Sequence, residues 1–173
     1  MSTTEKDIAS AVDAGGQHDH HEIPWIRKYV FATDHKMIAK QFMFVSLFFL
    51  VIGGLLAAMM RWQLGFPNQP MPGGSILPDA MMAPTPSGAI MLPEFYNSLL
   101  TMHGTIMIFF VAMPLLIGLI NFVLPQQLGA RDMAFPVLNQ VSLGLTATGA
   151  ALVMISLLIG KFGTGGWTMY PPY

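Results

Sequence analysis

Three long apolar segments without Asp, Glu, Lys or Arg constrain this chain more than any other feature. They cover residues 42–60, 95–124 and 137–160. A helix needs about 20 consecutive apolar residues to cross the hydrocarbon core of a bilayer. A spanning segment must also satisfy its backbone hydrogen bonds internally, and none of the three alternates like a barrel strand. The sequence therefore predicts an all-α, polytopic membrane protein with three transmembrane helices.

The overall composition agrees with a bilayer-embedded chain and excludes several functions. Only 10% of the 173 residues are charged, against roughly a quarter in soluble domains. A net charge of -1 without clustered basic residues argues against a nucleic-acid partner. The absence of Cys excludes disulfides, thiolate metal sites and a Cys nucleophile. The 15 Met residues favour packing in a core or against lipid over a Met-ligated metal.

The segments outside the apolar runs are polar or rich in breakers. Residues 1–23 lack periodicity and predict a disordered tail, whose His-rich stretch at 18–21 is expected to be solvated rather than a metal site. Residues 24–41 mix aromatic and basic side chains, which is typical of a membrane interface. Residues 61–94 are rich in Pro and Gly and predict an extended outer loop. Residues 125–136 form a short connection, and residues 161–173 follow the third span on the outer side.

The distribution of cations predicts the orientation. The basic residues Arg27, Lys28, Lys36 and Lys40 precede the first span. The loop after Arg61 has none, and Arg131 lies in the second connection. Because Lys and Arg are in excess on the cytoplasmic side of membrane proteins, we expect the N-terminus and the second connection to be cytoplasmic. Lys161 is a minor exception.

His103 is the most informative single residue, because it lies within the second apolar segment near its outer end. An imidazole in hydrocarbon is costly and is a candidate functional residue, although a hydrogen-bonded packing His is the alternative. Gly104 leaves room for the edge of a macrocycle, and Thr101 can form a hydrogen bond within the turn. Neutral imidazole is a common axial ligand of haem iron.

Long stretches of the chain resemble one family of membrane oxidases. The runs are TMHGTIMIFFVAMPLLIGLINFVLPQQLGARDMAFPVLNQVSLGL, GTGGWTMYPPY, FATDHKMIAKQF and MMRWQLGFP. They closely resemble subunit I of the haem–copper respiratory oxidases, in particular the aa3-type cytochrome c oxidases. The resemblance covers about residues 25–66 and 94–173. It implies that the three helices form the N-terminal part of a larger haem–copper oxidase helix bundle.

The resemblance assigns haem-binding roles to three residues. His103 occupies the position of an axial ligand of the low-spin haem, expected to be haem a. Arg61 matches an Arg that hydrogen-bonds the haem formyl group, which raises the reduction potential of the ring. Trp167 matches a Trp beside the haem propionates. Without the resemblance, Arg61 could extend to the interface and Trp167 could belong to an interfacial belt.

Four further residues match a proton pathway of that family. Asp132 corresponds to its cytoplasmic mouth, Asn121 and Asn139 to amides that hold a chain of waters, and Ser142 to a polar residue further in. Asn139 and Ser142 are three residues apart and so share a helix face. The alternatives are an exposed Asp132–Arg131 ion pair and a polar row that serves only helix packing.

Two departures from the family pattern affect the predicted function. Gln63 stands where many members carry a Glu near an outer cation site, so no such site is predicted. Quinol-oxidising members carry an Arg and an Asp in the first helix and a His and a Gln before the haem-ligating His. The corresponding residues here are Ile52, Leu56, Phe95 and Ser98. Their lack of ionisable groups favours cytochrome c as electron donor.

The implied activity is that of a bacterial inner-membrane oxidase. It would transfer electrons from cytochrome c through low-spin haem to a second haem and copper, and reduce oxygen to water with proton uptake and pumping. No His follows His103, so the ligands of the second haem and copper are absent and this chain alone is expected to be inactive. Expected partners are subunits II and III, cytochrome c and membrane lipid. A quinol oxidase, or a non-catalytic membrane subunit or channel, remains the alternative.

Overall fold

The computed structural model describes residues 29, 31–79, 81–159, 163, 165, 166, 168 and 170. The chain divides into two units, Met1–Phe31 and Ala32–Tyr173, and the fold below is that of the second. The predicted tail at 1–23, most of the segment before residue 34 and Trp167 lie outside the described residues. Three helical segments are long and apolar enough to cross a membrane, namely His35–Gly65, Pro93–Gln127 and Pro136–Ile159. This confirms the predicted all-α membrane fold.

Helix α3, His35–Gly65, is longer than the apolar run at 42–60 from which it was predicted. It begins at an N-cap, Asp34, whose carboxylate accepts a hydrogen bond from the Met37 amide at 3.3 Å. It ends at Phe66, whose amide donates to the Trp62 carbonyl. Its 31 residues span about 46 Å, more than the roughly 30 Å of a hydrocarbon core. The helix therefore extends beyond the apolar run at both ends.

The second span is one continuous helical segment with a wider stretch in its middle. It consists of α4, Pro93–Thr105, the π-helix η2, Ile106–Ala112, and α5, Met113–Gln127. Pro114 has no N–H, and in an α-helix its ring would clash with the carbonyl four residues earlier. In η2 the Met113 amide instead donates to the Ile108 carbonyl, five residues back. The π-helical turn thus accommodates Pro114 without breaking the span.

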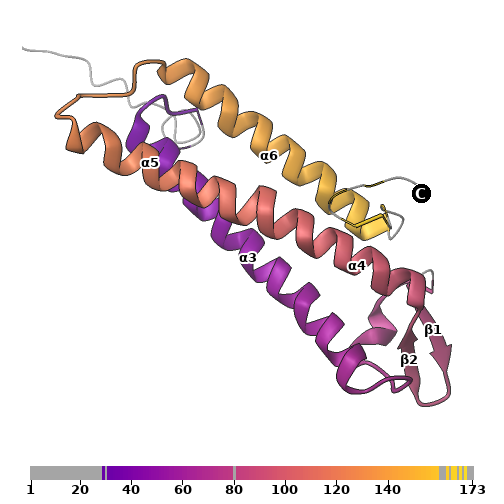
Figure 1. The fold of residues 1–173 in the computed structure, drawn as a ribbon. Coiled ribbons are helices and arrows are strands. Elements are labelled where there is room, and N and C mark those ends of the chain that lie inside the picture. Colours follow the sequence, from indigo (N-terminus) through magenta and orange to yellow (C-terminus); the bar gives the residue numbers. More distant parts are fainter. Residues whose placement is uncertain are drawn as a thin grey trace, which may run out of the picture. The chain divides into compact units, whose positions relative to one another are not determined.

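A Schellman motif ends α5. Gly129 has a φ of 66°, which favours glycine, and its amide donates to the Gln126 carbonyl at 3.3 Å. The Ala130 amide donates to the Pro125 carbonyl at 2.9 Å. These bonds satisfy carbonyls at the helix end and turn the chain toward α6, Pro136–Ile159. In Figure 1, α6 follows this connection and runs back along the second span.

The connection between the first two spans is more ordered than the extended loop predicted for residues 61–94. It contains a short 3₁₀ helix, η1, Gly74–Ile76, and two antiparallel strands, β1, Met82–Thr85, and β2, Gly88–Met91. Four buried methionines pack there and join the hydrophobic cluster of the helices: Met71, Met81, Met82 and Met91. Pro and Gly correctly indicated turns, but the antiparallel pairing and its methionine core depend on non-local contacts.

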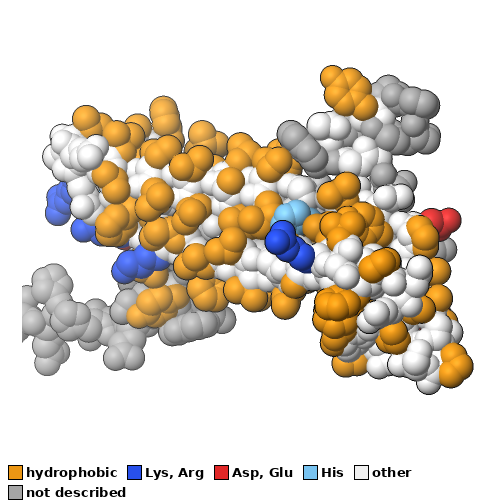
Figure 2. Space-filling view, turned by 60° about the horizontal axis from the view of Figure 1, so that its bottom comes forward, with side chains coloured by type: hydrophobic (Ala, Val, Ile, Leu, Met, Phe, Trp, Pro, Cys, Tyr) orange, Lys and Arg blue, Asp and Glu red, His pale blue; other side chains and the backbone are white. Residues whose placement is uncertain are grey.

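Small residues bring the helices close together. A Cβ added at Gly118 would lie 3.0 Å from the Ala39 carbonyl oxygen. A Cβ added at Gly53 would lie 2.6 Å from Met107 Sδ. Many large apolar side chains remain exposed, including Phe44, Leu47 and Leu145. Figure 2 shows hydrophobic side chains over most of the visible face of the helices. Such a surface suits lipid or further membrane helices.

Candidate functional site

His103 lies on α4, two residues before the α-helix passes into η2. Its Nδ1 is 3.0 Å from the Gly53 carbonyl oxygen of α3. Because a carbonyl can only accept, Nδ1 carries the proton and donates. Nε2 has no hydrogen-bond partner among the described residues and keeps its lone pair in the neutral tautomer. The contact therefore fixes both the tautomer and the ring orientation of His103.

The two helices approach closely beside Gly53. It is buried, and a Cβ there would come within 2.6 Å of Met107 Sδ and 3.6 Å of Ile106 Cγ2. Its neighbour Gly54 faces open space, with nothing within 4 Å of an added Cβ. Of this adjacent pair, only Gly53 faces the second span at close range.

The surroundings of His103 fit a haem ligand. Metal-ligating histidines usually donate their other ring N–H to a carbonyl or carboxylate, which is the arrangement with Gly53. His103 is half-buried, so the ring is held by the helices without being enclosed. The predicted hydrogen bond of Thr101 within its turn is present, from Oγ1 to the Asn97 carbonyl at 3.1 Å. Gly104 is half-buried and leaves its side of α4 without a side chain.

Of the other two predicted haem contacts, only Arg61 lies among the described residues, and it makes no hydrogen bond with His103. Arg61 is exposed near the end of α3 and forms no hydrogen bond or ion pair within the described part of the chain. Trp167 lies outside that part. Its neighbour Gly166 donates its amide to Thr101 Oγ1 at 2.9 Å, which ties the segment after α6 to the helix that carries His103.

Asp132 lies in the α5–α6 connection and is exposed. Its Oδ1 lies 3.0 Å from Nδ1 of His35, at the start of α3, and accepts the Met133 amide at 2.7 Å. His35 is only 3% exposed, and Asp34 Oδ1 lies 3.7 Å from the same ring nitrogen. Asp132 makes no ion pair with Arg131 among the described residues. The ion-pair alternative considered from the sequence is therefore not observed.

His35 was not among the site residues predicted from the sequence. In the sequence, His35 stands out only as one of the polar residues between Lys28 and Lys40, in the segment predicted to lie at the membrane interface. The hydrogen bond spans 97 positions in the chain, so no local pattern could reveal it. It also places the start of α3 and the α5–α6 connection at the same end of the helices, as their shared cationic character predicted.

The predicted amide residues do come together. Asn121 on α5 is buried, and its Nδ2 donates to Asn139 Oδ1 on α6 at 2.9 Å. Asn139 Nδ2 is buried and has no hydrogen-bond partner among the described residues. Ser142 is exposed and donates from Oγ to the Asn139 carbonyl at 2.7 Å. A buried amide donor without a partner is a place where an ordered water is expected.

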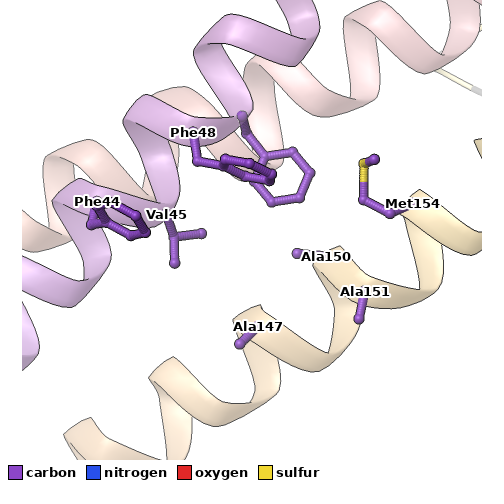
Figure 3. A pocket seen from close by; sticks show the side chains of 8 residues that line it. Phe44, Val45, Phe48, Ala147, Ala150, Ala151 and Met154 are labelled. Atoms are coloured by element: carbon purple, nitrogen blue, oxygen red, sulfur yellow. The ribbon is translucent and has the colours of Figure 1, made fainter. Parts of the chain in front are cut away.

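A crevice between α3 and α6 has a different character. Its cavity volume is about 230 Å³, and its lining is Phe44, Val45, Phe48, Phe49, Ala147, Ala150, Ala151 and Met154. Figure 3 shows the aromatic side chains of α3 opposite the small side chains of α6. The crevice has no hydrogen-bonding side chain, so it offers no support for water or protons. The polar residues between α5 and α6 are the better candidates for that role.

The comparisons with known proteins bear on this arrangement. The family model described as cytochrome c and quinol oxidase polypeptide I matches residues 37–173, which include His103 and Asp132. The chain belongs to this family. The resemblance to haem–copper oxidase subunit I, first drawn from sequence motifs, is thereby confirmed.

Individual relatives include both kinds of oxidase. A probable cytochrome c oxidase subunit 1 from Bradyrhizobium diazoefficiens is 43% identical over 151 residues, covering 87% of this chain and 20% of the relative. A cytochrome bo(3) ubiquinol oxidase subunit 1 from Buchnera aphidicola is 45% identical over 140 residues, covering 81% and 19%. The cytochrome c oxidase subunit 1 of Synechocystis is 37% identical over 154 residues, covering 89% and 24%. The chain thus spans about a fifth of the length of these members of the oxidase subunit I family.

Proposed function

We propose that this chain supplies one axial ligand of the low-spin haem in the catalytic subunit of a terminal oxidase, and that the ligand is His103. The observation that carries the proposal is the hydrogen bond from Nδ1 to the Gly53 carbonyl, which leaves Nε2 free with its lone pair. When bound, the haem supplies one-electron redox chemistry. The role of the chain is to hold His103 in the correct tautomer and orientation.

The ligand assignment is tested by His103→Ala in the full-length subunit assembled with its partners. The visible spectrum of the low-spin haem should be lost. Gln126→Ala, at an exposed position at the far end of the same span, should leave the spectrum unchanged. Retention of a normal low-spin band in His103→Ala would contradict the assignment and favour a packing role for this His.

For the whole oxidase we propose reduction of oxygen to water at a second haem and copper bound by other parts of the protein. Low-spin haem a, subunits II and III, and the surrounding lipid belong to the same proposal. Arg61 would hydrogen-bond the haem formyl group, and Trp167 would lie beside the propionates. Arg61 is exposed and has no hydrogen-bond or ion-pair partner among the described residues, which leaves its guanidinium available for that role.

We propose cytochrome c as the electron donor. Three of the four residues at the positions of the ionisable quinol set are apolar, Ile52, Leu56 and Phe95, and the fourth is Ser98. Leu56, Phe95 and Ser98 are also buried, which leaves little room for a polar head group there. A quinol donor is the second candidate, because ubiquinol oxidases are among the relatives at similar identity. Turnover with reduced cytochrome c, compared with turnover on a quinol, distinguishes the two.

We propose that protons enter from the cytoplasmic side, at Asp132, and pass along waters held by Asn121, Asn139 and Ser142, in a bacterial inner membrane with the N-terminus in the cytoplasm. The buried Asn139 Nδ2 has no partner in the described part of the chain, which supports a water at this point. His35 adds a group that orients the Asp132 carboxylate. In Asp132→Asn, proton uptake should slow while both haem spectra remain normal. Unchanged uptake would argue against this route.

A further inference from the structure

We propose that Ser46 is a positioning residue for His103, because it holds the π-helical segment η2 that follows the His-bearing helix. The inference rests on the proposed ligand role of His103 and adds a second point of attachment between α3 and the second span. Ser46 is 0% exposed, and its Oγ donates to the Val111 carbonyl at 2.8 Å. Burial of a hydroxyl among apolar side chains is costly unless the hydroxyl is hydrogen-bonded. The bond to Val111 therefore offsets the cost of burying Ser46.

Two hydrogen bonds join the same pair of helical segments on either side of the start of η2. Gly53 accepts from His103 before the π-helical turn, and Ser46 donates to Val111 near its end. Ser46 and Gly53 are seven residues apart on α3, close to two full turns, so they lie on one face about 10 Å apart along the axis. Between them, the rings of Phe49 and Phe110 pack with centroids 5.3 Å apart.

The π-helical turn determines how α4, which carries His103, is rotated about the helix axis relative to α5. A π-helical turn contains about one more residue than an α-helical turn. If the segment reverted to α-helix, residues on the His103 side would rotate by about 100° relative to those beyond Ala112. The His103 ring, and the direction of Nε2, therefore depend on the π-helical register being kept. Ser46 of α3 donates a hydrogen bond to the backbone of this π-helical segment, at the Val111 carbonyl.

The test uses Ser46→Ala and Ser46→Thr in the full-length, haem-loaded subunit. The first readout is the EPR spectrum of the ferric low-spin haem, whose g values depend on the orientation of the axial imidazole plane. The second is hydrogen exchange of the backbone amides of residues 106–112. Ser46→Ala should shift the g values and speed exchange by roughly fivefold, the factor expected from the net loss of one buried hydrogen bond. Ser46→Thr, which keeps the hydroxyl, should restore both toward wild type.

Two further variants make the result specific. Thr148→Ala removes an exposed hydroxyl that bonds only to its own helix, at the Gly144 carbonyl, and should change neither readout. Ser46→Cys keeps the volume with a weaker donor, and its g values should lie between those of wild type and Ser46→Ala. If Ser46→Ala fails to accumulate with haem, the ordering of Ser46→Thr and Ser46→Cys decides the question.

The possible outcomes separate this inference from the ligand assignment. Faster exchange with unchanged g values would show that Ser46 stabilises η2 without orienting His103, and would overturn the proposal. Unchanged exchange and unchanged g values would overturn it as well. If His103→Ala keeps the low-spin signal, the ligand assignment fails and this inference fails with it. If His103→Ala loses the signal while Ser46→Ala is normal, only the positioning role is refuted.

Discussion

The buried imidazole of His35 donates a hydrogen bond from Nδ1 to Oδ1 of Asp132 at 3.0 Å, across 97 positions of the chain. A carboxylate can only accept, so this ring nitrogen carries the proton. The other nitrogen, Nε2, is buried without a partner among the described residues. The contact fixes the start of α3 to the α5–α6 connection and limits the rotamers of an otherwise exposed carboxylate.

His35→Ala should therefore slow proton uptake by the assembled oxidase and reduce stability. Asp132 would lose its fixed orientation, and removal of a buried ring should cost about 1–3 kcal/mol of unfolding free energy. Proton uptake is measured with a pH indicator after rapid mixing with oxygen. Lys36→Ala, at the exposed neighbouring position, is the control and should behave as wild type. Equal uptake rates in the two variants would rule out an orienting role for His35.

The hydrogen bond between Asn121 and Asn139 should show energetic coupling. Asn121→Ala leaves Asn139 Oδ1 without its donor, and an unmade hydrogen bond at a buried group costs about 1–3 kcal/mol. A double-mutant cycle with Asn139→Ala measures the coupling from thermal unfolding in detergent. Because both amides belong to the proposed water chain, both single variants should also slow proton uptake. Strict additivity of the two changes would mean that the contact contributes nothing to stability.

The features that sequence could predict are those encoded locally. Three uncharged apolar runs gave three spans, because length and hydropathy are properties of single segments. His103 was singled out by its chemistry alone, and Asn121 and Asn139 were grouped in one proton pathway by family resemblance, although their direct hydrogen bond was not predicted. The spacing of Asn139 and Ser142 likewise predicted their neighbouring positions on α6.

The features that sequence could not predict depend on distant contacts. The Asp132 partner is 97 residues away, and the π-helical register before Pro114 is held by Ser46 from another helix. Pro114 lacks an N–H and its ring would clash with the carbonyl four residues earlier, but the sequence does not show whether a kink or a wider turn relieves this. The structure has the wider, π-helical turn, and this turn packs against α3.

Gly129 should tolerate Asn better than Ala, because its φ of 66° lies in the left-handed region. A non-glycine residue there costs roughly 1–2 kcal/mol, and Asn is the side chain that best accepts it. Thermal unfolding should show Gly129→Ala to be destabilised by about that amount and Gly129→Asn by less. Gly144→Ala is a matched control, because an added Cβ meets nothing within 4 Å at either position but Gly144 lies within a helix. If both Ala variants were equally stable, the Schellman turn would not depend on glycine.

The adjacent glycines of α3 give the sharpest test of how His103 is held. Gly53→Ala places a Cβ within 2.6 Å of Met107 Sδ, whereas Gly54→Ala meets nothing within 4 Å. Overpacking of this kind typically costs about 1–3 kcal/mol, and separation of the helices would lengthen the bond from His103 to the Gly53 carbonyl. Gly53→Ala should therefore lower the low-spin haem content of the purified oxidase, measured from its visible spectrum, while Gly54→Ala should not.

A compensating substitution distinguishes steric separation from other effects of Gly53→Ala. Met107→Ala removes the sulfur that the new Cβ would meet, so the double variant Gly53→Ala/Met107→Ala should recover most of the low-spin haem. The cavity left by the shortened side chain should still lower stability, by about 2–5 kcal/mol at most. In the double variant, haem content should therefore recover while the free energy of unfolding stays below that of wild type. A Gly53→Ala protein with wild-type haem content would show instead that Met107 moves aside, and that the close approach of the two helices is not needed to hold His103.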